Sequence, residues 1–198
     1  KEKGYINGDL SKTATIRDAI MGKAPWSTKG SAQVVYSTCH DNRTLWDEIQ
    51  LSNPDDSMEE QVKQYLMSAA IVYTSQGTPF IFAGEEMLRT KDGDENSYKS
   101  SDEINNIDWE VLTKDSKEYE VMQYYKQLME LRNAFPNSLN PDSGVKENFI
   151  YAEEKGTTAN WDGYFKADME ELVAYKRKEK CDENNCVHDT NTGVLKTN

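Results

Sequence analysis

The stretch VVYSTCHDNRTLWDEIQ, residues 34–50, begins as an apolar strand and ends in a polar cluster. β-Branched and aromatic positions alternate over residues 33–39, which predicts one buried strand. The polar side chains that follow at once are those of His40, Asp41, Asn42 and Arg43. One interpretation is a strand that ends in an ordinary Asp-Asn turn. The other is a barrel strand whose end carries polar groups because substrate binds there.

Helical and strand-like segments alternate around this stretch. A short helix is expected near residues 11–22. Ser57 and Glu60 have the spacing of a capping box, and the helical spacing of the apolar residues after them predicts a helix over residues 58–75. PFIFAG, residues 79–84, is a short apolar run that predicts a second buried strand.

A further helix is expected after a long polar loop over residues 89–109. It should open near Asp115, with Glu118 three residues on, and stop at Pro136. The apolar residues expected on its buried face are Val121, Met122, Tyr125, Leu128 and Met129. Alternation of strands and helices predicts parallel strands covered by helices, which is an α/β fold.

A second domain is expected after a break near residues 137–147. NFIYAEE, residues 148–154, and ELVAYKRK, residues 171–178, are typical of antiparallel strands in a β domain. The predicted domains are therefore 1–137 and 138–198.

Composition excludes some functions. The formal net charge of −12 and the lack of a dense basic cluster argue against a nucleic-acid partner. No apolar run approaches the roughly 20 residues that cross a bilayer, so no membrane partner is expected. The N-terminal segment has no signal-peptide core, and the chain does not start with Met. The compartment stays open, with a secreted or cell-surface location preferred over the cytoplasm.

The cysteines permit several interpretations. The polar tail contains Cys181 and Cys186, with His188 two residues after the second cysteine. The two cysteines are free thiols, form a small disulfide loop, or bind zinc together with His188. Zinc needs a fourth ligand that the sequence does not offer, so free thiols are preferred. Cys39 is expected to be a small buried thiol in the first strand.

Two predicted parallel strands cannot close a barrel by themselves. We therefore expect this chain to be the last part of a larger barrel. The long loop over residues 89–109 supports this interpretation, because loops of that length in compact domains usually serve a site.

Two segments carry a family resemblance. YSTCHDNRTLWDEI, residues 36–49, and TPFIFAGEEMLRTKDGDENSYKSSDEINNIDW, residues 78–109, resemble the regions around the seventh and eighth barrel strands of type I pullulanases. These are starch-debranching enzymes of the α-amylase superfamily, glycoside hydrolase family 13. The resemblance covers residues 4–136 well and 147–178 loosely. It implies the end of a (β/α)8 TIM barrel, about strands 7 and 8 with their helices, followed by the start of an antiparallel β-sandwich domain.

The resemblance also implies roles for particular residues. Asp41 corresponds to the third catalytic carboxylate, which supports the oxocarbenium-like transition state. His40 resembles the residue that bonds sugar hydroxyls beside the broken bond, and Asn42 resembles a substrate-contacting position. Weaker candidates for contacts to further glucose units are Arg89, Asp94, Asn96 and Tyr98.

The implied function is hydrolysis of α-1,6-glucosidic bonds in pullulan, branched starch or glycogen by a retaining mechanism. The nucleophile and the acid/base have no match in this chain and are expected upstream of Lys1, so the chain alone should be inactive. The expected partners are an α-glucan and the upstream part of the same enzyme. The alternatives are an α-amylase or amylopullulanase of the same superfamily, or a noncatalytic carbohydrate-binding protein.

This function requires no cofactor, and a calcium site in the full-length enzyme stays an open alternative. Asp92, Asp94 and Glu95 lack the full EF-hand spacing, so a solvated loop is preferred there over a metal site. Glu85 and Glu86, as neighbours on a strand, should point to opposite faces, and they are assigned structural roles such as pairing with Arg89 or capping the following loop. Aromatic side chains can stack against sugar rings, but packing in the core or in loops is the preferred interpretation for four of them. These are Trp46, Trp109, Tyr98 and Tyr36.

Overall fold

The structure of the chain is a computed structural model, and it describes residues 2–22, 25–26, 32–134, 149–151, 173–177 and 194–195. The α-helices are α1 (Thr13–Ile20), α2 (Leu45–Ser52), α3 (Met58–Thr74), α4 (Asp102–Asn105) and α5 (Lys117–Ala134). Short 3-10 turns are η1 (Tyr5–Asn7), η2 (Leu10–Lys12), η4 (Glu85–Met87), η5 (Ser97–Lys99) and η6 (Trp109–Val111). The strands are β1 (Val34–Val35), β2 (Thr78–Pro79), β3 (Phe149–Tyr151), β4 (Val173–Arg177) and β5 (Val194–Leu195).

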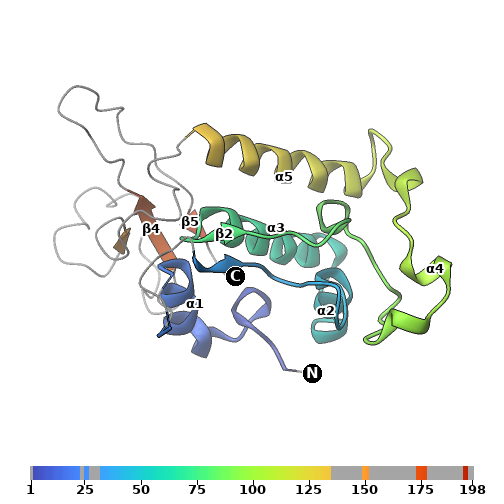
Figure 1. Cartoon of the computed structure of the whole chain (residues 1–198), viewed down its shortest axis with the longest axis horizontal. Coiled ribbons are helices and arrows are strands. Elements are labelled where there is room, and N and C mark those ends of the chain that lie inside the picture. The colour runs from blue at the N-terminus through green and yellow to red at the C-terminus, as the bar shows by residue number, and fades with distance from the viewer. Residues whose placement is uncertain are drawn as a thin grey trace.

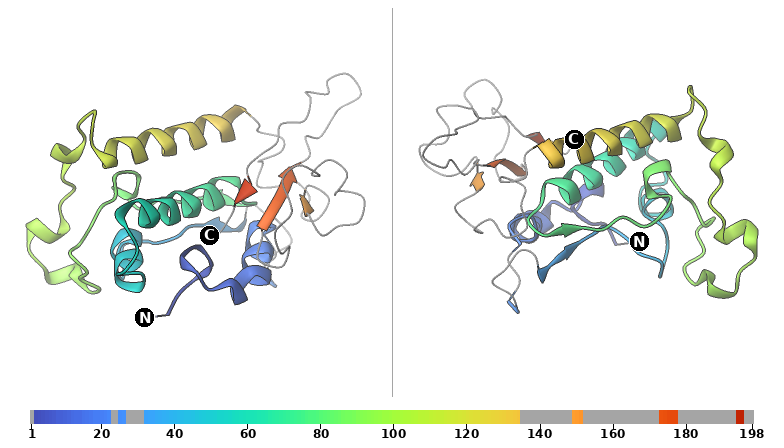
Figure 2. Two further views of the ribbon diagram at one scale, coloured as in Figure 1. Left: turned by 180° about the vertical axis from the view of Figure 1, so that it is seen from behind. Right: turned by 45° about the horizontal axis from the view of Figure 1, so that its top comes forward.

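Helix α3 lies at the centre of the N-terminal part. It contacts α5 on one side and the N-terminal turn η1 on the other, as Figure 1 shows. The two long helices α3 and α5 run alongside each other in the further views of Figure 2 as well. The largest apolar core therefore forms between α2, α3, η4 and α5.

Strands β1 and β2 pair in parallel, which confirms the orientation predicted from the alternation of strands and helices. Each strand is two residues long, which is shorter than the runs 33–39 and 79–84 that we expected. Their predicted burial is also wrong at several positions, because Val34 is 58% exposed and Phe80 is 43% exposed. Within the described residues no third strand continues this sheet, so each of the two strands has one edge without a strand paired to it there.

The start of α3 is the predicted capping box. The Ser57 hydroxyl accepts from the Glu60 backbone N–H at 3.3 Å, and the Ser57 N–H donates to the Glu60 carboxylate at 2.7 Å. These bonds satisfy backbone groups that a helix start otherwise leaves unpaired. The helix ends at Thr74, one residue before the predicted end.

Helix α5 exists where the sequence predicted it, but its cap differs. The side chain of Ser116, not Asp115, accepts from the backbone N–H of Tyr119 at 3.1 Å. Either residue type can cap a helix, so the spacing alone did not separate them. Val121, Tyr125 and Leu128 are buried as expected, whereas Met129 is 41% exposed.

Helix α2 was not predicted. Its N-cap is Thr44, whose hydroxyl accepts from the Asp47 backbone N–H at 3.1 Å. It buries Trp46 against Tyr65 of α3, with ring centroids 5.9 Å apart. Trp46 is therefore a core residue, as the packing interpretation expected, and it supplies no platform for a sugar. Helix α1 occupies part of the segment where a short helix was expected.

Strands β3, β4 and β5 form a three-stranded antiparallel sheet. β3 and β4 lie within the two segments predicted as antiparallel strands, and β5 was not predicted. The expected domain break at residues 137–147 lies outside the described residues, as do Cys181, Cys186 and His188. Assignment of β1 and β2 to the seventh and eighth barrel strands, and of β3–β5 to a sandwich, stays a prediction.

Among the residues that the structure describes, no helix has both the length and the apolar character needed to cross a membrane.

Candidate functional site

The loops that follow β1 and β2 together form a polar cavity of about 260 Å³, which we call the His40 cavity. The carboxyl ends of parallel strands meet at one edge of a sheet, which explains why these two loops are neighbours. The predicted site residues that line it are His40, Asp41, Asn42, Arg89, Asn96 and Tyr98. Further lining residues, which were not among the predicted site residues, are Phe82, Lys91, Glu95, Ser97 and Asn105.

His40 and Asp41 present their side chains openly. The two side chains are 78% and 76% exposed, and His40 Nε2 lies 3.5 Å from Asp41 Oδ2. Asn42 has a φ of 63°, a left-handed conformation that Asn tolerates better than most residues. The backbone thus bends sharply here and leaves the Asp41 carboxylate able to accept hydrogen bonds from a hydroxylated ligand.

A buried lysine holds this bend in place. Lys91 is only 4% exposed, and its Nζ donates to the backbone carbonyl of His40 at 2.8 Å. The same ammonium lies 5.4 Å from the ring centroid of Phe82. In the sequence Lys91 is one of two lysines in the polar loop over residues 89–109, and no local pattern distinguished it from the exposed Lys99.

Two more residues attach the first loop to the second. Arg43 donates from Nε to the carbonyl of Gly93 at 2.9 Å, and its Nη2 lies 2.7 Å from a carboxylate oxygen of Glu95. Asp47, buried on α2, accepts from the backbone N–H of Lys91 at 2.8 Å. The walls of the His40 cavity are therefore tied together by charged side chains that bond to backbone groups.

Arg89 holds together two parts of the loop that follows β2. It donates to the carbonyls of Ala83 and Asn105, and its guanidinium lies 4.7 Å from the ring centroid of Phe82. Burial lowers the pKa of this guanidinium from its ordinary value. A Cβ on Gly84, which has a φ of 91°, would lie 2.7 Å from Arg89 Cδ, so glycine fits this close approach.

Asp94 takes a different place from the other predicted residues. It does not line the His40 cavity, because its carboxylate accepts from the Ser100 hydroxyl and from the Asn96 backbone N–H at 2.8 Å. The Ser100 hydrogen bond, followed by that of Asn96, lowers the pKa of Asp94. Asp94 thus organises the loop that presents Asn96 and Tyr98, and Tyr98 is 74% exposed.

Glu85 and Glu86 lie in the 3-10 turn η4, so the premise that they are strand neighbours is wrong. Glu85 is buried and accepts from the Tyr125 hydroxyl at 3.0 Å and from the Thr38 hydroxyl at 3.4 Å. Burial raises the pKa of Glu85 to about 7. The Glu86 carboxylate accepts from the Gly84 N–H at 3.0 Å. Arg89, which was suggested as an ion-pair partner of these glutamates, instead donates to backbone carbonyls. The structural roles assigned to both glutamates stay a prediction.

Cys39 lies after β1 and is partly exposed, so the expectation of a buried thiol within the strand is wrong. Over the described ranges, no three His, Cys, Asp or Glu side chains gather closely enough to hold a metal ion.

Comparisons with known proteins by sequence and by structure find the same kind of relative. No protein-family model matches the sequence. A pullulanase of Bacillus subtilis (strain 168) is 34% identical over 144 residues, which covers 69% of this chain and 19% of that protein.

Solved structures agree with the sequence match. The pullulanase from Bacillus acidopullulyticus superposes with a TM-score of 0.75 at 32% identity, over 89% of this chain and 20% of its own. The type I pullulanase of Bacillus subtilis str. 168, solved in complex with maltose, gives a TM-score of 0.74 at 28% identity, over 89% and 24% of the two chains. The chain is therefore a relative of the pullulanases and spans about a fifth of the length of the Bacillus proteins that it matches.

Proposed function

We propose that the full protein to which this chain belongs hydrolyses α-1,6-glucosidic bonds in pullulan and in branched starch or glycogen, with retention of configuration. The observation that carries the proposal is the His40 cavity, which brings His40, Asp41 and Asn42 together with residues of the loop after β2. The relatives named pullulanases support the choice of reaction. In this proposal β1 and β2 are the seventh and eighth barrel strands, and β3–β5 begin a C-terminal sandwich.

Asp41 supplies charge rather than a new bond in this mechanism. As the glycosidic bond breaks, positive charge develops on the sugar ring and the ring flattens. An exposed carboxylate can accept hydrogen bonds from ring hydroxyls that tighten in this state, and His40 can donate to a neighbouring hydroxyl. Asn42 offers an amide from the same bend, which Lys91 holds through the carbonyl of His40.

A retaining mechanism needs two further carboxyl groups about 5 to 5.5 Å apart, one as nucleophile and one as acid/base. The proposal assigns both to the remainder of the protein, because no residue of this chain resembles either. This chain by itself is accordingly expected to be inactive, and the remainder of the same enzyme is its structural partner. Asn96 and the exposed Tyr98 are proposed to contact glucose units beyond the reacting one.

The test of linkage is product analysis with the full-length protein. On pullulan we expect new reducing ends and maltotriose as the main product, with little release from linear amylose. Rapid shortening of amylose without cleavage of pullulan would favour the α-amylase alternative. Binding of either glucan without any hydrolysis would instead support a noncatalytic carbohydrate-binding protein.

Lys91 provides a second test, as a positioning residue. The change Lys91→Met removes the donor to the partly buried His40 carbonyl, which costs about 1 kcal/mol of stability. Because the bend carrying Asp41 loses its anchor, we expect kcat on pullulan to fall about tenfold with a smaller change in KM, measured well below the melting temperature.

The matched control for Lys91→Met is Lys126→Met, on an exposed position of α5, which should change neither kcat nor KM. A Lys91→Met protein with a lower melting temperature but unchanged kcat would reduce Lys91 to a stabilising role. Lys91→Arg keeps the donor and should recover part of the lost turnover.

A further inference from the structure

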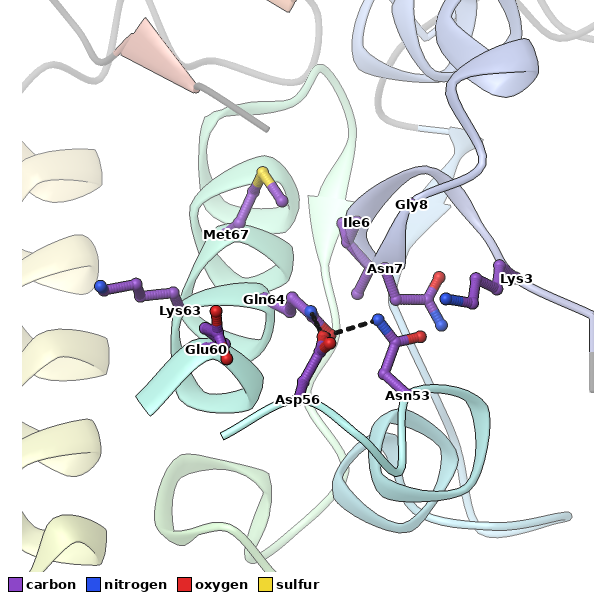
Figure 3. A pocket seen from close by; sticks show the side chains of 10 residues that line it. All are labelled: Lys3, Ile6, Asn7, Gly8, Asn53, Asp56, Glu60, Lys63, Gln64 and Met67. Carbon is purple, nitrogen blue, oxygen red and sulfur yellow. Dashed lines mark hydrogen bonds between the residues drawn. The ribbon is translucent and has the colours of Figure 1, made fainter. Parts of the chain in front are cut away.

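A second polar cavity of about 400 Å³ lies between the N-terminal turn, the end of α2 and the first turns of α3. We call it the Asp56 cavity, and Figure 3 shows its lining. The lining residues are Lys3, Ile6, Asn7, Gly8, Asn53, Asp56, Glu60, Lys63, Gln64 and Met67. None of them lines the His40 cavity.

Asp56 is the centre of this lining. One of its carboxylate oxygens, Oδ2, accepts from the amide groups of Asn53 at 2.8 Å and Gln64 at 2.6 Å, drawn as dashed lines in Figure 3. These bonds, that of Asn53 first, lower the pKa of Asp56, and the charge of Lys3 acts in the same direction. The carboxylate is therefore ionised at neutral pH.

The same bonds orient two amides so that their oxygens lack partners. A carboxylate only accepts hydrogen bonds, so the NH₂ groups of Asn53 and Gln64 must face Asp56. Their oxygens, Asn53 Oδ1 and Gln64 Oε1, are buried and have no hydrogen-bond partner in the structure. An unpaired buried acceptor is unfavourable, so the amides of Asn53 and Gln64 are held beside Asp56 with one bonding group each unused.

Charge at the Asp56 cavity is close to balanced. Glu60 is engaged by the cap of α3, where its carboxylate accepts from Ser57, and Lys63 lies 3.0 Å from Glu59. Lys63 also extends away from the cavity in Figure 3. Lys3 and Asp56 remain as one positive and one negative group. A lining of this kind favours a neutral ligand over a polyanion or a metal cation, which would meet the ammonium of Lys3.

From this lining we infer that the Asp56 cavity binds a neutral ligand rich in hydroxyl groups. Each hydroxyl both donates and accepts, which matches the acceptor on Asp56 and the donor on Lys3. The side chains of Ile6 and Met67 add apolar surface for the C–H face of a sugar ring. We identify this ligand as a glucosyl unit of an α-glucan because the proposed function has an α-glucan as substrate, and this step rests on that function.

The experiment titrates the full-length protein with maltotriose by calorimetry and follows pullulan hydrolysis in parallel. We expect two binding events, of which Gln64→Leu weakens one by about tenfold or more while pullulan turnover changes less than twofold. Lys3→Met alters only an exposed side chain and should weaken the same event. Gln50→Leu, the same change at an exposed position of α2, is the matched control and should alter neither event.

A single binding event in the unaltered protein, or two events that Gln64→Leu and Lys3→Met both leave unchanged, would overturn the inference. Binding of calcium chloride that Gln64→Leu abolishes, with no effect of the variant on maltotriose, would also overturn it in favour of a cation. Absence of pullulan hydrolysis together with the expected loss of maltotriose binding would sink the proposed function and leave a hydroxyl-binding cavity.

Discussion

The change Asp41→Asn in the full-length protein is expected to lower kcat on pullulan by about 10²- to 10³-fold, which is the usual scale for removing one electrostatic contact to a transition state. The amide keeps the size of the side chain but removes the negative charge that accepts from ring hydroxyls. Because Asp41 is exposed, its replacement should leave the free energy of unfolding nearly unchanged. Maltotriose affinity should fall by less than about fivefold, because the proposed contacts strengthen mainly in the transition state.

The matched control for this prediction is Asp55→Asn, the same chemical change at an exposed residue outside the His40 cavity. It should retain full turnover. Steady-state kinetics on pullulan and calorimetric titration with maltotriose measure the two quantities separately. Unchanged turnover in Asp41→Asn, or equal losses of turnover and of binding, would refute the assigned role.

A second large effect is expected in stability as a function of pH, through Glu85. Burial raises the pKa of Glu85 from 4.5 to about 7, so the folded protein holds a proton that the unfolded chain has released over this window. Stability from this group is therefore fully present below pH 4.5 and is lost as the pH rises to about 7. The loss amounts to at most about 3 to 4 kcal/mol, since each tenfold difference in proton affinity between pKa 4.5 and about 7 corresponds to about 1.4 kcal/mol.

The groups that face Glu85 do not offset this effect. Tyr125 and Thr38 donate hydrogen bonds that favour the ionised form, but burial outweighs them, and the neighbouring charge of Glu86 raises the pKa further. Burial raises the pKa values of Tyr65 and Tyr125 well above their ordinary value, so both phenols remain neutral over the window.

Glu85→Gln is the direct test, measured as the free energy of unfolding in urea at a series of pH values. Gln keeps an acceptor for Tyr125 and cannot ionise, so the variant should lose this part of the pH dependence and gain relative stability above pH 7. Glu130→Gln, on an exposed position of α5, should keep the pH profile of the unaltered protein. Parallel profiles for Glu85→Gln and the unaltered protein would show that Glu85 does not titrate in this window.

Local signals in the sequence determined the elements that depend on neighbouring residues. Ser57 and Glu60 are three residues apart, and a capping box needs only that spacing, so the start of α3 could be predicted. The parallel pairing of β1 and β2 is not a local contact, but it followed from the order of strands and helices along the chain. The resemblance to pullulanases, carried by residues 36–49 and 78–109, likewise came from the sequence and agrees with the related proteins.

The packing of the folded chain sets how the site is held and which side chains reach it. Lys91 bonds to the carbonyl of His40, 51 residues away along the chain, and no local pattern encodes such a distant contact. The sequence predicted Asp94 and Asn96 equally as glucan contacts. In the structure the carboxylate of Asp94 accepts a hydrogen bond from the Ser100 hydroxyl of its own loop. Burial is decided in the same way: Val34 carries the pattern of a core strand, yet its exposure depends on which other segments cover the sheet. Sequence spacing fixes contacts within a turn of the chain, whereas contacts between loops depend on the packing of the helices and strands that carry them.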